Sequence, residues 1–307
     1  MSRPAGWADA IALTRPRQWP VLTAQFVAGT VFALPAGPTA ADALGAVRAG
    51  PLLAGWAAWV VLLNGGTLAF NSAWDRDREA VAFLPRPPQP PAWLATAALA
   101  AMAAGAALGA LAVGRGFGAL TAACVALSAA YSHPRTRWKG RPGLDLATNM
   151  AGYGAGTTAA ELLAARAALP GDLPAPGPGP ALACLGFACL FGSFYPLTQL
   201  YQLAADRARG DRTLSARLGP GRALDLSLLL GLLALGALEA ALAAGGRASW
   251  RGLPAAALFL WLLNLAHWRR HAGSLAPAGH ERGMYRALAL WALVDLTLVA
   301  AWLLPAR

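Results

Sequence analysis

Nine long apolar stretches are the feature that most constrains how this chain folds. They cover approximately residues 20–36, 51–73, 92–114, 116–132, 144–165, 181–204, 223–245, 252–268 and 284–305. Each is close to the roughly 20 residues with which an α-helix crosses a hydrocarbon layer of about 30 Å. The sequence therefore predicts one all-α, polytopic membrane domain over residues 1–307, a bundle of about nine transmembrane helices. Eight helices are the alternative, because the fourth and eighth stretches are short and the fifth is the least apolar.

The distribution of charge supports a membrane protein and gives it an orientation. Charged residues make up 13% of the 307 residues, about half the share that is usual in soluble domains. The net charge of +11 does not indicate nucleic-acid binding, because the basic residues lie in short clusters between apolar stretches. If loops alternate across the membrane, 19 of the 25 basic residues fall on the side of the N-terminus. By the positive-inside rule this predicts a multi-pass protein of the plasma membrane with a cytoplasmic N-terminus.

A first polar cluster follows the second apolar stretch. It reads Asn71-Ser72-Ala73-Trp74-Asp75-Arg76-Asp77-Arg78-Glu79. If the helix continues through it, Asn71, Asp75 and Glu79 share one face. Oxygen ligands of this kind suit Mg²⁺, which binds a few carboxylates together with substrate phosphates. A solvated charge cluster at the membrane surface is the alternative.

A second polar cluster follows the sixth stretch, on the same predicted side of the membrane. Gln199, Gln202 and Asp206 are spaced to share one helix face, and Gly210 provides a helix stop one turn later. Between the two clusters lies a cationic loop, from Tyr131 to Pro142, that contains Lys139, the only lysine of the chain. Arginine and lysine side chains are the usual partners of phosphate oxygens. Ordinary positive-inside topology explains most of these arginines, and Arg137, Lys139 and Arg141 are the preferred exceptions.

These motifs together resemble the UbiA superfamily of intramembrane prenyltransferases, over nearly the whole chain. The family's first motif, NDxxDxxxD followed by an arginine-proline pair, is matched by Asn71, Asp75, Glu79, Arg86 and Pro87. Its second motif, DxxxD followed by RxxGxxTL, is matched by Asp206, Arg207, Gly210, Thr213 and Leu214. The segments with Arg15-Pro16, with Tyr131-Ser132 and with Asn149 are also similar to the family.

The resemblance implies a Mg²⁺-dependent prenyltransferase that moves a prenyl group from an isoprenoid diphosphate to a lipophilic, aromatic or quinone-precursor acceptor. It implies a cytoplasmic site in which Asp75, Asp206 and Lys139 are catalytic. The implied metal ligands are Asn71, Asp75, Asp77, Glu79 and Asp206. The implied substrate-binding residues are Asn71, Arg86, Arg137, Arg141, Arg207, Gln199, Gln202, Tyr131, Asn149 and Arg15.

The chain departs from the family pattern at three positions. Ser72 and Gln202 stand where the family usually has aspartate, and Glu79 replaces a third aspartate. Fewer carboxylates imply weaker or fewer Mg²⁺ sites. Asp77 and Asp211 are candidates to compensate for the missing carboxylates. Three alternatives to the prenyltransferase are an intramembrane terpene cyclase, a non-catalytic relative and a transporter. A transporter is disfavoured because transporters place polar sites near the bilayer midplane.

Further acids lie inside the apolar stretches. Glu161 and Glu239 are expected near the outer ends of their helices, where hydration makes a charge inexpensive. Asp295 is expected close to the midplane, where acids are costly and often functional. A hydrogen-bonded structural role is an equally good interpretation of Asp295.

Overall fold

The computed structural model describes residues 6–33, 45–77, 81, 83–170, 177–208 and 210–304, without the side chains of Val31, Phe32, Ala205, Arg207 and Ala248. The chain divides into two compact units. Unit 1 consists of Met1–Phe26, Val47–Arg137 and Leu163–Pro170, and unit 2 of Val27–Ala46, Trp138–Leu162 and Gly171–Arg307. The single domain predicted over residues 1–307 stays a prediction.

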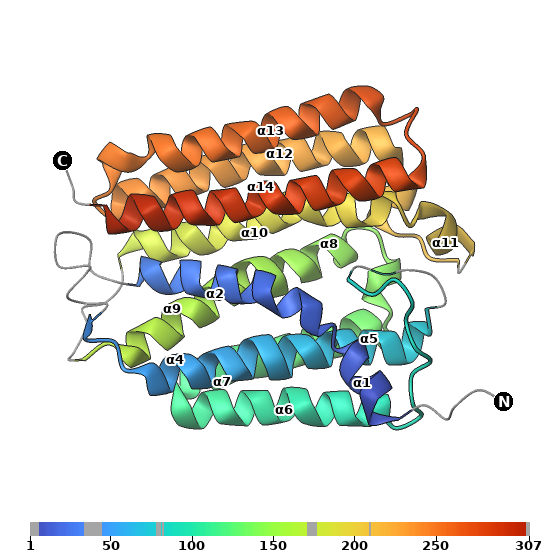
Figure 1. Ribbon diagram of the computed structural model, residues 1–307, viewed down its shortest axis with the longest axis horizontal. Helices are drawn as coiled ribbons and strands as arrows, with labels where there is room; N and C mark the ends of the chain where they lie inside the picture. The colour runs from blue at the N-terminus through green and yellow to red at the C-terminus, as the bar shows by residue number, and fades with distance from the viewer. Residues whose placement is uncertain are drawn as a thin grey trace. The chain divides into compact units, whose positions relative to one another are not determined.

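Helices make up both units (Figure 1). Unit 1 contains α1 (Trp7–Leu13), α4 (Ala49–Trp56), α5 (Gly65–Asp75), α6 (Leu94–Ala112) and α7 (Arg115–Ser132), with a π-helical segment, Ala57–Asn64, joining α4 to α5. Unit 2 contains α8 (Leu144–Asn149), a second π-helical segment, Met150–Gly156, and then α10 (Pro178–Leu200), α11 (Leu203–Ala208), α12 (Leu214–Ala244), α13 (Gly252–His271) and α14 (Pro277–Leu303). Residues of α2 (Trp19–Phe32) and α9 (Thr157–Ala168) belong partly to each unit.

The prediction of an all-α membrane protein is confirmed. Within the described residues, each of the nine predicted apolar stretches overlaps a helical segment. Five of these segments are long and apolar enough to cross a membrane: Ala49–Asp75, Leu94–Ala112, Pro178–Leu200, Leu214–Ala244 and Pro277–Leu303. α14 begins seven residues before the predicted apolar stretch, because the helix includes the polar turns that precede it. In α12 the helical backbone is interrupted at Gly219 (φ 76°, ψ 165°), which Pro220 follows, so a short helix over residues 214–218 precedes the long one. Thr213 starts α12 as its N-cap, and its hydroxyl accepts a hydrogen bond from the Ala216 amide.

Small residues bring the helices of each unit close together. In unit 1, a Cβ atom on Gly118 of α7 would lie 2.4 Å from the Cβ of Ala110 in α6. In unit 2, a Cβ atom on Gly154 would lie 2.5 Å from the Cα of Ala188 in α10. Close backbone approach through small residues is typical of helices packed in a membrane, where dispersion contacts replace the hydrophobic effect as the driving force.

Unit 2 also contains a group of five aromatic side chains, here called the aromatic cluster. Its members come from the π-helical segment, α10, α13 and α14, and they are Tyr153, Phe191, Phe194, Trp261 and Trp291. Tyr153 stacks on Phe191 with ring centroids 5.1 Å apart, and Trp291 meets Phe191 and Phe194 edge to face. Such pairs contribute beyond the area they bury, so the cluster fixes how these four segments pack.

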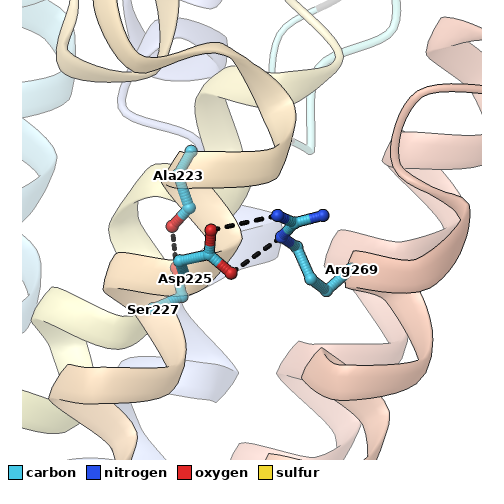
Figure 2. A network of polar contacts seen from close by, with 4 residues as sticks. All are labelled: Ala223, Asp225, Ser227 and Arg269. Atoms are coloured by element: carbon cyan, nitrogen blue, oxygen red, sulfur yellow. Dashed lines mark hydrogen bonds and ion pairs between the residues drawn. The ribbon is translucent and has the colours of Figure 1, made fainter.

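An exposed ion pair links α12 to α13 (Figure 2). The Arg269 guanidinium donates to both carboxylate oxygens of Asp225, from Nε at 2.7 Å and from Nη2 at 3.2 Å. Hydrogen bonding to Asp225 and its charge raise the pKa of Arg269 above the usual value. Because both side chains are exposed to about half their extent, we expect the pair to contribute little stability.

We predict that Gly154→Ala destabilises the protein, because the new methyl group would meet the backbone of α10, which cannot move aside as a flexible side chain can. The control is Gly236→Ala in α12, whose Cβ would meet nothing within 4 Å. Thermal unfolding in detergent should show a lower midpoint for Gly154→Ala and an unchanged or higher one for Gly236→Ala. Equal midpoints for the two variants would contradict the packing described for α10.

Candidate functional site

The first polar cluster lies at the end of α5 in unit 1. The helix ends at Asp75 because Arg76 adopts a left-handed backbone conformation, with φ 49° and ψ 44°. The amide of Arg76 donates to the Ser72 carbonyl at 3.1 Å, which closes the last turn. Asn71 and Asp75 share a helix face as predicted, and Asp77 follows in non-helical backbone. Glu79 lies outside the described residues.

The end of α5 is joined to the end of α7. The buried Ser132 hydroxyl donates to the amide oxygen of Asn71 at 3.0 Å. The Trp74 and His133 rings also meet edge to face, 5.3 Å apart. Tyr131, next to Ser132, is half-buried at the same end of α7. The structure thus brings Asn71 and the Tyr131-Ser132 motif together. Ser72 is buried, so an aspartate there would be largely removed from water.

Three arginines of unit 1 have left-handed backbone. Among the described residues, positive φ outside glycine occurs at Arg15 (53°), Arg76 (49°), Phe83 (63°) and Arg137 (43°). This conformation is uncommon for residues with a side chain, and strained backbone tends to gather at functional sites. Arg15 and Arg137 were predicted from the sequence, whereas Arg76 was not. Arg86, also predicted, is exposed.

The second polar cluster is divided between two helices of unit 2. Because α10 ends at Leu200 and α11 begins at Leu203, the predicted common face of Gln199, Gln202 and Asp206 is wrong. Gln202 is half-buried in the turn, where its amide donates to the Tyr201 hydroxyl at 3.1 Å. Gln199 and Asp206 are buried, one in each helix.

Asp206 is held by the loop that leads to α12. The Thr213 hydroxyl donates to one oxygen of the Asp206 carboxylate at 3.3 Å, and the Asp211 amide donates to the Asp206 carbonyl at 2.9 Å. Gly210 turns the chain between them with φ 77°, a backbone conformation that glycine adopts without strain. The predicted helix stop at Gly210 is therefore confirmed. The side chain of Arg207 lies outside the described residues.

Asp145 is a central residue of this end of unit 2 that sequence reasoning missed. Its carboxylate, at the first turn of α8, is fully buried and accepts four hydrogen bonds. The amides of Gly143 and Leu146 donate to one oxygen at 2.9 and 2.8 Å, and Gln199 Nε2 and the Leu214 amide donate to the other at 3.0 and 2.9 Å. Asp145 thereby ties α8 to the end of α10 and the start of α12. Its sequence signal was a single acid in an apolar stretch just after a glycine.

Both ends of the Gln199 amide are engaged in this network, because its oxygen also accepts from the Ser215 amide at 3.0 Å. The Asn149 amide donates to the Asp145 carbonyl at 2.8 Å. Lys139, in a short helical turn before α8, is only 8% exposed, whereas Arg141 is exposed. The role of Lys139 as a diphosphate ligand stays a prediction.

The acidic side chains of the described residues are better suited to a metal ion that is bound together with substrate phosphates than to a metal ion that is bound by protein ligands alone. Nowhere in the described part of the chain do three Asp, Glu, His or Cys side chains form a group. Asp206 offers a buried carboxylate beside a hydroxyl, and Asn71 and Asp75 offer two oxygen donors on one face. Mg²⁺ usually binds one or two carboxylates together with substrate phosphates and water, and each of these two sets of donors, taken by itself, suits that arrangement.

The fold and the site together define the class of this protein. It is a helical membrane protein with acids and amides at its helix ends. The chain belongs to the UbiA prenyltransferase family, which matches residues 30–293; members of this family are prenyltransferases. None of the curated proteins matches the sequence significantly.

Solved structures of UbiA homologs are similar over nearly the whole chain. A homolog from Archaeoglobus fulgidus bound to GPP and Mg²⁺ is 17% identical, with a TM-score of 0.58 over 95% of this chain and 99% of that one. A homolog from Aeropyrum pernix K1 is 20% identical, with a TM-score of 0.61 over 95% and 97%. A digeranylgeranylglyceryl phosphate synthase is 13% identical, with a TM-score of 0.63 over 96% and 98%. At these identities the likeness shows a common fold.

We predict that Asp145→Asn destabilises the protein by about 2 kcal/mol or more. The NH₂ group that replaces one carboxylate oxygen would face two N–H groups, which now donate hydrogen bonds to that oxygen. The matched control is Asp225→Asn, which removes an exposed acid from α12 and should cost less than about 1 kcal/mol. Thermal or denaturant unfolding in detergent compares the two. A loss no larger for Asp145→Asn than for Asp225→Asn would show that the network does not hold this end of unit 2 together.

Proposed function

We propose that this chain is a Mg²⁺-dependent intramembrane prenyltransferase, which transfers a prenyl group from an isoprenoid diphosphate to an aromatic or quinone-precursor acceptor. The observation that carries the proposal is the buried Asp206 carboxylate beside Thr213, in a chain of the UbiA family. A UbiA homolog of the same fold was solved with GPP and Mg²⁺, and another structure of it holds DMAPP and Mg²⁺. Asp206 and the Asn71–Asp75 face would each contribute oxygen ligands.

In the proposed reaction the C–O bond of the allylic diphosphate breaks and diphosphate leaves with the electron pair. Bound Mg²⁺ would supply positive charge against the leaving group, which lowers the barrier to ionisation. Asn71, Asp75, Asp77, Glu79 and Asp206 are the proposed metal ligands. Lys139 and Arg137 would bind diphosphate oxygens, assisted by Arg86, Arg141 and Arg207.

The remaining predicted residues would position the substrates. Tyr131 and Tyr153 offer aromatic faces to the allylic cation, and Arg15 and Asn149 are proposed contacts of the acceptor. The acceptor's π electrons form the new C–C bond, and its ring then releases a proton. The engaged amide of Gln199 favours an indirect role, in which it orients the start of α12 through Ser215; Gln202 remains a proposed contact of the diphosphate.

We further propose that the site faces the cytoplasm and that the protein resides in the plasma membrane. This orientation is supported by the basic residues, of which 19 of 25 fall on one side of the predicted topology.

We predict Mg²⁺-dependent release of diphosphate from labelled GPP or longer isoprenoid diphosphates by the purified protein in lipid vesicles. Asp75→Ala and Asp206→Ala should each lower the rate at least about 100-fold, because each removes a carboxylate that stabilises developing charge. Asp225→Ala, which removes an acid outside the proposed site, is the control and should keep the wild-type rate. Unchanged rates in both site variants would refute the proposed site. Release without a prenylated acceptor would indicate a terpene cyclase instead, and no release by the wild-type protein would indicate a non-catalytic relative.

We predict that Gln202→Asp lowers the Mg²⁺ concentration for half-maximal diphosphate release several-fold, because it restores a carboxylate that the family motif usually carries. Gln202→Asn, which shortens the side chain without adding charge, is the control. A Mg²⁺ requirement that is the same for Gln202→Asp and wild type would mean that position 202 does not reach the metal.

A further inference from the structure

Two buried acids of unit 2 lie outside the proposed catalytic residues. Glu161, in α9, is fully buried, and Asp295, in α14, is 6% exposed. The two carboxyl groups are close enough to interact electrostatically. The expectation that hydration at a helix end accommodates Glu161 is wrong, because its side chain has no contact with solvent.

Three oxygens of this acid pair have no hydrogen-bond partner within the described part of the chain. They are both carboxyl oxygens of Glu161 and Oδ1 of Asp295. Asp295 does receive a hydrogen bond from the Trp291 indole one turn earlier in α14. Buried polar atoms are nearly always bonded, because leaving one without a partner costs roughly 1–3 kcal/mol. Buried oxygens without a partner on both of these interacting acids therefore indicate a group that supplies hydrogen-bond donors.

The packing around Glu161 is adapted to this acid. A Cβ atom on Gly29 of α2 would overlap the Glu161 carboxyl group, 1.6 Å from Oε2. The carboxyl group thus lies directly on the backbone of α2, in space that any other residue at position 29 would fill. Glycine at this position is explained by close approach of a side chain and not by an unusual backbone angle.

The aromatic cluster lies between the acid pair and the Asp145 network of unit 2. Along one helical segment the order is Asp145, Tyr153 and Glu161, so that the two acids are 16 residues apart, or roughly 24 Å at 1.5 Å per residue. Tyr153 stacks on Phe191 of the cluster. Trp291 belongs to the cluster and also bonds Asp295. Aromatic side chains thus connect two polar regions, and the distance between these regions along the helical segment is similar to the length of an extended lipid-like molecule.

We propose that Glu161 and Asp295 form a second polar site, which binds a hydroxyl group on an elongated, otherwise apolar ligand. The hydroxyl donates to a carboxyl oxygen of the pair, and its apolar chain runs along the aromatic cluster. The acid pair lies outside the residues of the diphosphate chemistry proposed above, although Tyr153 of the aromatic cluster is common to both, and binding to the pair requires neither a donor substrate nor Mg²⁺.

The test compares labelled hexadecanol with its methyl ether, which has the same chain but no hydroxyl donor. Binding of each to the purified protein in nanodiscs is measured without diphosphate or Mg²⁺. Wild-type protein should bind the alcohol about tenfold more tightly than the ether, since only the alcohol can donate to the buried oxygens. Glu161→Leu and Asp295→Leu should abolish this preference. Glu239→Leu, which removes a partly buried acid of α12 beside Arg251, should retain it.

Equal binding of the alcohol and the ether by wild type would overturn the proposal, and so would a preference that survives in both leucine variants. If the leucine variants fail to fold, Glu161→Met, whose side chain is similar in length but has no oxygen acceptor, must still reduce the preference. A preference unchanged in folded Glu161→Met also overturns the proposal. Diphosphate release is measured separately on the wild-type preparation, so failure of the proposed enzymatic function is recognised independently.

Discussion

The hydrocarbon interior of a membrane offers no hydrogen-bond partners, and this constraint determines where the chain carries its polar groups. Backbone groups are satisfied inside helices, and most charged side chains are placed at or between helix ends. Inside the helices, small residues and aromatic rings provide the packing, as Gly118 does in unit 1 and the aromatic cluster does in unit 2. A polar side chain that remains buried therefore needs a specific reason, which makes each one informative about function.

Asp145 has such a reason. Its carboxylate satisfies the start of α8, the Gln199 amide of α10 and the first amide of α12. Asp206 in α11 and Thr213 in the loop that follows belong to one segment between α10 and α12, two of the three helices that Asp145 joins. The network therefore fixes both ends of this segment. A segment that is already fixed loses less conformational freedom when Asp206 binds a ligand. In unit 1, the hydrogen bond from Ser132 to Asn71 performs a similar task at the end of α5.

Hydropathy predicted the helical segments well because lipid imposes their length and composition. The ends of the helices were harder, because they depend on backbone angles and tertiary bonds that spacing does not reveal. Arg76 in a left-handed conformation separates Asp77 from the helical face of Asp75, and the break after Leu200 separates Gln199 from Asp206. Asp145 and the burial of Glu161 were missed because their partners, or their packing against Gly29, come from distant parts of the sequence. The identities of the motif residues were visible in the sequence, whereas their surroundings were not.

The central claim is that the buried Asp206 carboxylate serves the binding of a Mg²⁺-bound diphosphate, and binding measured without turnover tests it most directly. Binding of GPP to the purified protein in nanodiscs would be measured with and without Mg²⁺ for the wild type, for Asp206→Asn and for the control Asp225→Asn, which changes an exposed acid of α12. The account predicts Mg²⁺-dependent binding by the wild type and the control, and its loss in Asp206→Asn. Mg²⁺-dependent binding as tight in folded Asp206→Asn as in the wild type would contradict it.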